Sequence, residues 1–287
     1  MSLHRTIVIV LTATLFVSFV AMLSACRPSS NKQHTIAVSI QPQRYLLEQI
    51  VGDRYDVVAL LQDDANPEQF ESSINNVMAL EQCDAYFMIG RIGFEAALLN
   101  RLTSNRPELK VCDTSQGIEQ LHDSSGNNII DTYIWMSVHN ARIIARNMLD
   151  GVIALDAKHA DNYIRHYNEL IKKLDALNKE ITAMCEMHQD EYFLVWRPSL
   201  SYFARDYGLQ QIAVETEDNE ATTERIEQVV SFVKSHEVKA FFYQKDLDQR
   251  MVETMNKTVK APTGEFAPMS YNWDKEMLKI ASIIANN

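Results

Sequence analysis

The sequence is poor in the residues that build phosphate-binding loops and disulfide scaffolds. Its 287 residues include 8 glycines, and no GxGxxG or Walker-type loop occurs, so a phosphate-binding enzyme has no support. With 4 cysteines and 7 prolines it is neither a disulfide-rich miniprotein nor a collagen. Basic residues are also in the minority, 27 against 38 acidic ones. The resulting charge of −11 argues against nucleic acid or an anionic membrane face as the main partner.

The first residues differ from the rest of the chain. After a basic start, Thr6–Ala25 is almost wholly apolar and carries no charge. The segment closes with Leu-Ser-Ala-Cys, ending at Cys26, which resembles a bacterial lipobox, where the cysteine becomes the acylated first residue. We therefore expect a lipoprotein signal peptide at 1–25, lipidation of Cys26 and a tether at 26–33. An uncleaved membrane helix is the alternative, because about 20 apolar residues can span a bilayer.

Cleavage after Ala25 would leave 262 residues, with 26 basic against 38 acidic side chains and a net charge of −12. Three cysteines remain, an odd number outside the cytoplasm, so at most one disulfide can form. We expect Cys83, Cys112 and Cys185 to be small buried apolar side chains. No further apolar run reaches transmembrane length.

The mature chain alternates strand-like and helix-like segments, which predicts parallel α/β sheets. A helix at about 158–187 keeps apolar residues on one face over about eight turns, longer than most globular helices. The predicted fold is α/β, with two lobes, each a parallel sheet flanked by helices, joined by this helix. The predicted boundaries are 34–156 for the N-terminal lobe, 157–188 for the linking helix and 189–287 for the C-terminal lobe.

The residue pattern of the second half also predicts a helix cap and a loop. Asp246 with Gln249 three residues later predicts a capping pair for the helix that ends near Val259. Residues 260–270 are expected to form a loop before the last helix.

Several short sequence motifs, in order along the mature chain, resemble those of a known family. Asn66–Glu71 is similar to Asp-Pro-His-x-Tyr-Glu, and Asp131–Ser137 to Asp-Pro-His-Val-Trp-Leu-Ser. Tyr202–Leu209 is close to Tyr-Phe-x-x-x-Tyr-Gly-Leu, and Ala267–Met269 stands where Asp-Pro-Leu is usual. Together they resemble the solute-binding lipoproteins of zinc and manganese ABC importers, the cluster A-I periplasmic binding proteins.

The resemblance implies a function and a location. It implies a monomeric extracytoplasmic substrate-binding protein that delivers zinc, manganese or a metal-linked solute to an ABC permease. The protein would be held on the periplasmic or cell-surface side of a bacterial membrane by acylated Cys26. No enzymatic activity is expected, because the Ser and Glu residues at strand ends form no nucleophile elbow and no histidine is placed as a base for a cysteine or serine. No nucleic acid is expected as a partner, because the chain is acidic.

The metal-ligand positions depart from the family pattern. Members hold the ion with one side chain after each of four strands, typically three histidines and a carboxylate. Carried over, these positions are Glu68, Tyr133, Arg197 and Ala267. Zinc needs about four N, S or O donors. Glu68 can serve, Tyr133 only weakly and Ala267 not at all, whereas Arg197 brings a positive charge to the ion's place. A carried-over zinc site is therefore not supported.

Three interpretations of the cleft stay open. Glu68 and Arg197 could pair across it, with Tyr133 nearby, as a latch between the lobes. A guanidinium and a phenol could instead suit an anion or a metal–chelate complex. In a third hypothesis the metal is held by Glu68 together with neighbouring residues such as Glu71, Glu217, Glu220, Tyr243 or Glu265.

The cleft walls and a second function are also predicted. Trp135, Trp196 and Tyr243 are expected to be wall residues. The alternative function is a degenerate family member without a metal site, acting as a scaffold or interaction lipoprotein or binding an anionic small molecule.

Overall fold

The computed structural model describes residues 34–63, 65–70, 73–90, 92–122, 131–215 and 221–286. The predicted signal peptide, the tether and Cys26 lie outside these residues, as do the candidate ligands Glu71, Glu217 and Glu220. In the described part of the chain, no helix is both long and apolar enough to cross a membrane.

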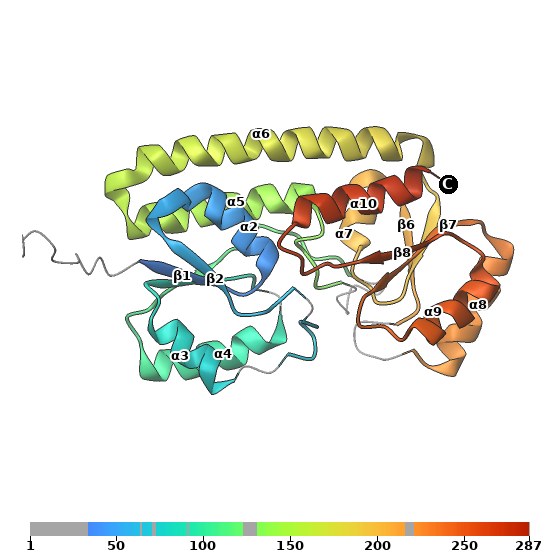
Figure 1. The fold of residues 1–287 in the computed structure, drawn as a ribbon, viewed down its shortest axis with the longest axis horizontal. Coiled ribbons are helices and arrows are strands. Elements are labelled where there is room, and N and C mark those ends of the chain that lie inside the picture. Colours follow the sequence, from blue (N-terminus) through green and yellow to red (C-terminus); the bar gives the residue numbers. More distant parts are fainter. Residues whose placement is uncertain are drawn as a thin grey trace, which may run out of the picture. The chain divides into compact units, whose positions relative to one another are not determined.

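The N-terminal lobe is built on a parallel sheet with the strand order β2-β1-β3-β4. Helices cover both faces, with α2 and α5 on one side and α3 and α4 on the other (Figure 1). The strands are β1 (Thr35–Val38), β2 (Asp56–Ala59), β3 (Ala85–Met88) and β4 (Lys110–Asp113). The helices are α2 (Gln41–Val51), α3 (Ile74–Glu81), α4 (Gly93–Asn105) and α5 (Val138–Leu155).

The C-terminal lobe repeats this topology in the order β6-β5-β7-β8, again all parallel. Helix α7 ends at Gly208, whose φ of 70° is the left-handed conformation that glycine adopts most easily. The strands are β5 (Tyr192–Val195), β6 (Gln210–Ala213), β7 (Val238–Gln244) and β8 (Thr263–Phe266). The helices are α7 (Ser201–Tyr207), α8 (Thr223–Ser235), α9 (Gln249–Val259) and α10 (Trp273–Ala285).

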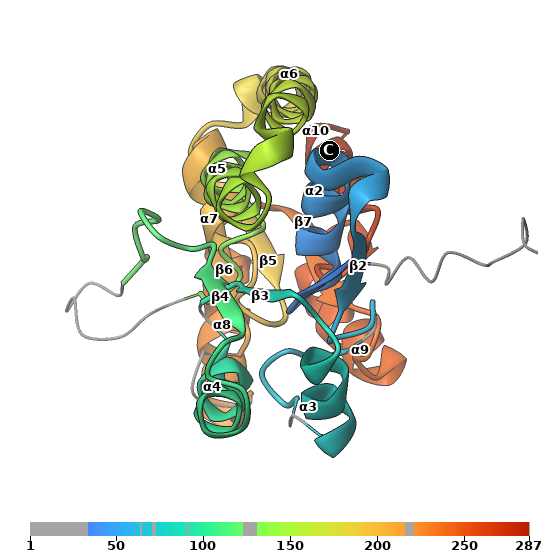
Figure 2. The ribbon, with the colours of Figure 1, turned by 90° about the vertical axis from the view of Figure 1, so that its left-hand side faces the viewer.

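The long helix α6 (Ala160–Cys185) joins the two lobes, as the apolar periodicity predicts. Single 3-10 turns at Ala157–His159 and Glu186–His188 extend it at both ends. It runs along α5, α2 and α10, so it touches helices of both lobes (Figures 1 and 2). One apolar core continues from β1 through α6 to α10. Separating the lobes as rigid bodies would therefore expose apolar surface to water.

Two predictions for the second half are wrong. The predicted loop at 260–270 contains β8, a four-residue edge strand that pairs with β7. Its sequence, Thr-Gly-Glu-Phe, has too little apolar character to signal a strand on its own. The cap of α9 is Asp248, whose side chain accepts a hydrogen bond from the Arg250 N–H. Asp246 is therefore free to serve in the cleft.

Candidate functional site

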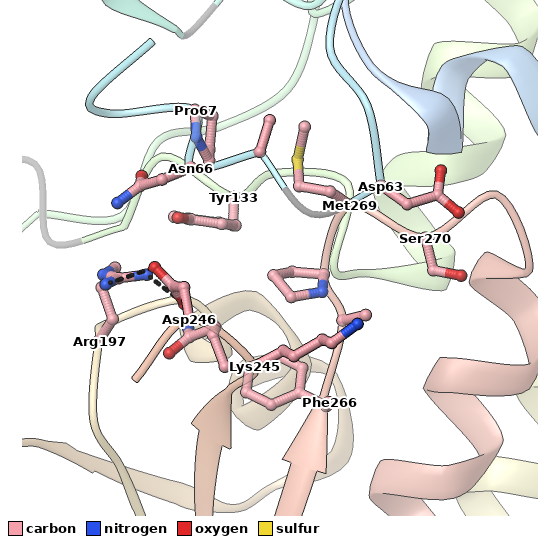
Figure 3. A pocket seen from close by; sticks show the side chains of 14 residues that line it. Asp63, Asn66, Pro67, Tyr133, Arg197, Lys245, Asp246, Phe266, Met269 and Ser270 are labelled. Atoms are coloured by element: carbon pink, nitrogen blue, oxygen red, sulfur yellow. Dashed lines mark hydrogen bonds and ion pairs between the residues drawn. The ribbon is translucent and has the colours of Figure 1, made fainter. Parts of the chain in front are cut away.

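A cavity of about 350 Å³ lies between the lobes, lined by segments that follow the carboxyl ends of strands (Figure 3). In open parallel sheets this is where ligands bind, outside the strand ends at which the strand order reverses. Its volume is in the range of a small-molecule site rather than of a single ion. The lining residues are Asp63, Ala65, Asn66, Pro67, Tyr133, Arg197, Gln244, Lys245, Asp246, Phe266, Ala267, Pro268, Met269 and Ser270.

Arg197 is the buried cation of this cavity, and two carboxylates of its own lobe hold it. Its side chain is 12% exposed, and its Nε lies 3.3 Å from Glu215 Oε2. Its two terminal nitrogens face both oxygens of Asp246, at 3.5 and 3.2 Å (Figure 3). Desolvation lowers the pKa of Arg197, but the charge of Asp246, with smaller contributions from Tyr133 and Glu215, raises the pKa above its ordinary value. The guanidinium stays charged and is neutralised locally.

Glu68 lies on the opposite lobe, against Tyr133. The Tyr133 hydroxyl donates a hydrogen bond to the Glu68 side chain, and both this bond and the charge of Arg197 lower the Glu68 pKa. Desolvation is the larger effect, so the pKa of Glu68 is raised above its ordinary value although the residue as a whole is exposed.

The predicted latch between Glu68 and Arg197 is wrong. Among the residues that the structure describes, the ion pairs of Arg197 are with Glu215 and Asp246, and none joins it to Glu68. Both carboxylates that satisfy Arg197 stand in its own lobe, after neighbouring strands, and are closer to it than Glu68. The guanidinium therefore organises the C-terminal lobe rather than latching the two lobes together.

Asp131 fixes Tyr133 at the junction of the lobes. Its side chain is fully buried and accepts the Tyr133 N–H and the Ser201 N–H, each at 2.7 Å. Ser201 is the first residue of α7, so one carboxylate ties the loop of one lobe to a helix of the other. Tyr133 itself is 1% exposed, which leaves its ring little freedom.

Of the four positions carried over from the family pattern, Tyr133, Arg197 and Ala267 line the cavity. Ala267 offers no side-chain donor, and its backbone N–H is taken by Glu276 at 3.1 Å. The candidate displaced ligands Glu265 and Tyr243 do not line the cavity. Each precedes a lining residue on its strand, Phe266 or Gln244, and successive side chains of a strand point to opposite faces.

The two tryptophans expected as walls lie elsewhere. Trp135 is 1% exposed and joins the lobes, because its Nε1 donates to Pro268 O at 2.8 Å and its carbonyl accepts from Trp273 Nε1 at 2.8 Å. Trp196 donates to Glu215 at 2.6 Å and lines a separate groove with residues of α8 and α9. The apolar walls of the cavity are Pro67, Phe266, Pro268 and Met269.

Glu215 and Asp246 were not predicted from the sequence as partners of Arg197. Each stands two residues after a strand, β6 or β7, so a charged residue just past a strand end was the available signal. In the described part of the chain, no three His, Cys, Asp or Glu side chains gather as a metal site would require. The carboxylates that do converge enclose a guanidinium, and this donor set does not fit a bare divalent cation.

Comparison with known proteins gives the family. The model of the family "Zinc-uptake complex component A periplasmic" matches residues 36–276. The chain belongs to this family. The solved structure of ZnuA has a TM-score of 0.81 and 29% identity, over 88% of this chain and 98% of that one. Another neighbour, a ZnuA deletion mutant with zinc bound, has the same TM-score and identity over 97% of its length.

Two sequence relatives agree with membership of the zinc-uptake family. A Chlamydia muridarum protein named for metal binding is 27% identical over 222 residues, 76% of this chain and 78% of its own length. The zinc-binding protein AdcA of Streptococcus pyogenes is 20% identical over 265 residues, 84% of this chain and 52% of its own. The chain thus spans about half the length of AdcA. The resemblance predicted from the sequence and the two-lobe fold are confirmed.

Proposed function

We propose that this protein is the extracytoplasmic substrate-binding component of an ABC importer and that its cargo is a small neutral or cationic solute, such as a metal complex, rather than a bare zinc or manganese ion. Membership of the zinc-uptake family supports the transport role. The observation that supports this cargo is Arg197, held in the cavity by Glu215 and Asp246.

A bare cation would meet Arg197 at close range. At an effective dielectric constant near 20, two unit positive charges about 4 Å apart repel by about 4 kcal/mol, and a divalent ion doubles this. The carboxylates that could offset the repulsion, Glu215 and Asp246, are already engaged by the guanidinium. A metal that arrives with its own ligands needs no coordination by the protein and stays farther from Arg197.

An anionic solute is not favoured either. Two carboxylates neutralise the one charge of Arg197, and Glu68 and Asp63 add further negative charge on the other lobe. Lys245 is the remaining basic side chain among the lining residues. This charge balance favours a neutral or cationic solute over the anion that Arg197 alone would suggest.

The proposal includes the anchor and the partner. Acylated Cys26 would hold the protein on the bilayer, and an ABC permease would take the solute. The protein would then be a monomeric receptor without enzymatic activity, as the family resemblance implies.

Titration of the full chain tests the cargo. Calorimetry with zinc chloride and manganese chloride should give no binding tighter than millimolar. Equilibrium dialysis against the neutral complex of one ferric ion with three acetohydroxamates should show retained iron, and deletion of the gene should lower metal uptake by the cell. Nanomolar binding of free zinc would refute the proposal in favour of displaced ligands. Retention of no complex, with no uptake defect, would favour the scaffold role.

A further inference from the structure

The charged side chains that line the cavity fall into two groups. Arg197 and Asp246 pair with each other, and Glu215 completes the neutralisation of the guanidinium. Lys245 and Asp63 also line the cavity, and both are exposed. In the described part of the chain, no ion pair or side-chain hydrogen bond includes either of them. Their charges are therefore available to a solute.

The two available charges have opposite signs and stand on opposite lobes. Asp63 follows β2 in the N-terminal lobe, and Lys245 directly follows β7 in the C-terminal lobe. Figure 3 shows Arg197 and Asp246 at one end of the cavity, with the amine of Lys245 directed away from them, toward the side where Asp63 lies. The cavity is thus bordered by a negative side chain from one lobe and a positive side chain from the other.

This arrangement suits a solute that carries both charges. The cavity of about 350 Å³ has the size of a small molecule, and a solute that fills it meets the walls of both lobes. A simple anion would be attracted by Lys245 but repelled by Asp63, and a simple cation would meet the reverse. A solute with one charge of each sign is attracted at both ends, so its charge distribution is complementary to that of the cavity.

Arg197 is the other basic side chain that a carboxylate could approach. Its terminal nitrogens face Asp246 at 3.5 and 3.2 Å, and its Nε faces Glu215 at 3.3 Å. A solute carboxylate at Arg197 would have to compete with these two carboxylates and would be repelled by them. Lys245 can bind a carboxylate without breaking an existing ion pair.

We infer that the cavity binds a zwitterionic solute of the amino-acid type, with its cationic group at Asp63 and its carboxylate at Lys245. Such a solute is neutral overall, which agrees with the neutral cargo of the proposed function. The inference rests on that function, in that the cavity takes a solute, and it names the charges of the solute. Lys245 and Asp63 are then specificity-determining residues that select two opposite charges on one molecule.

The experiment uses metal-free probes of different length and the full chain. Saturation-transfer NMR compares the zwitterions glycine, γ-aminobutyrate and ε-aminocaproate with amines and carboxylates of matching length, which keep one charged end each. At least one zwitterion is expected to bind in the millimolar range, about fivefold or more tightly than its matched amine and its matched carboxylate. Binding of none of the zwitterions, or binding without this preference, would overturn the inference.

Substitutions assign the two ends. Lys245→Met should weaken the zwitterion to the affinity of its matched amine, and Asp63→Asn should weaken it to that of its matched carboxylate. The matched control is Lys257→Met, because Lys257 is also an exposed lysine of the C-terminal lobe but does not line the cavity. Lys257→Met should keep the affinity and the preference. An equal loss in Lys257→Met and Lys245→Met would refute the contact, because net charge would then explain both.

Exchange of the two charges separates recognition from a structural role. A zwitterion can bind end for end, so the double variant Asp63→Lys with Lys245→Asp should recover the preference that Lys245→Met loses. Because both side chains are exposed, the melting temperatures of all these variants should stay within about 2 °C of the parent's. A double variant that melts like the parent but shows no preference would overturn the inference. Since no probe carries a metal, retention of the ferric complex alongside that result would leave the proposed function standing.

Discussion

Arg197 and Asp246 meet across the carboxyl ends of β5 and β7, with two guanidinium nitrogens 3.5 and 3.2 Å from the two carboxylate oxygens. They are 49 positions apart in the sequence and are neighbours because β5 and β7 are adjacent parallel strands. This pair, completed by Glu215, places an internal cation where the family pattern places a metal ligand.

Arg197→Ala should destabilise the protein near neutral pH by about 1–3 kcal/mol, because it leaves the charge of the partly buried Glu215 without its ion-pair partner, with only the hydrogen bond from Trp196 remaining. Asp246 is 41% exposed and can be solvated, which keeps the loss moderate. Urea unfolding at pH 7 measures it, with Arg197→Lys as the control that keeps the charge. An Arg197→Ala protein as stable as the parent would contradict the role given to the ion pairs.

The same substitution should create affinity for bare divalent cations. Without the guanidinium, Glu215 and Asp246 are free, and Glu68 stands on the opposite lobe. Titration with manganese chloride should show binding by Arg197→Ala and none by Arg197→Lys. If neither variant binds manganese, the positive charge of residue 197 is not what excludes the metal.

Glu68 should make stability fall as the pH rises above the ordinary carboxyl pKa. Its pKa is raised in the folded protein by desolvation, so between the unfolded and folded values the native state holds the extra proton. The favourable contribution is thus present at acid pH and is lost as the pH rises through the folded value. Glu68→Gln should flatten this dependence in unfolding measurements across that range. NMR titration of the Glu68 carboxyl should also show a further rise of its pKa in Arg197→Ala, since the Arg197 charge lowers it.

Asp131→Ala should cost about 2–4 kcal/mol of unfolding free energy, because two buried N–H groups, of Tyr133 and Ser201, lose their acceptor. Chemical denaturation measures the loss. Asp131→Asn, which keeps one oxygen for one of the two N–H groups, should cost less. A milder effect of the alanine variant than of the asparagine variant would refute the assignment.

The thiols of Cys83 and Cys185 should stay unreactive in the folded protein. Both are buried, and desolvation raises the pKa of each to about 11, so little thiolate exists near pH 8. Reaction with a disulfide reagent should become complete only on addition of denaturant. All three described cysteines are free, and Cys83 and Cys185 are buried as predicted, whereas Cys112 is only half-buried.

The sequence predicted most of the strands and helices because short local patterns of residue types indicate them. Thr35–Val38 and Tyr192–Val195 are runs of β-branched and aromatic residues, and Gly208 ends α7 where a left-handed residue is needed. The strand β8 was not predicted because it is short, contains Gly264 and depends on its pairing with β7. The domain boundaries stay predictions.

The same difference between local sequence pattern and tertiary packing holds for the residues of the cleft. Tyr133 and Ala267 could be placed in it from the sequence because they stand in motifs that resemble the family pattern, and Arg197 because it follows a predicted strand at a position where members carry a metal ligand. Trp135 and Trp196 could not be placed, since which side of a strand end a side chain takes depends on the packing around it.

The sequence by itself determined an acidic chain with two α/β lobes, a long helix and an arginine at a metal-ligand position, whereas the signal peptide stays a prediction. Only the tertiary structure decided what that arginine does. Its partners Glu215 and Asp246 follow other strands, and the order β6-β5-β7-β8 brings them to it. Local patterns fix elements, whereas pairings between distant residues follow from strand order and burial.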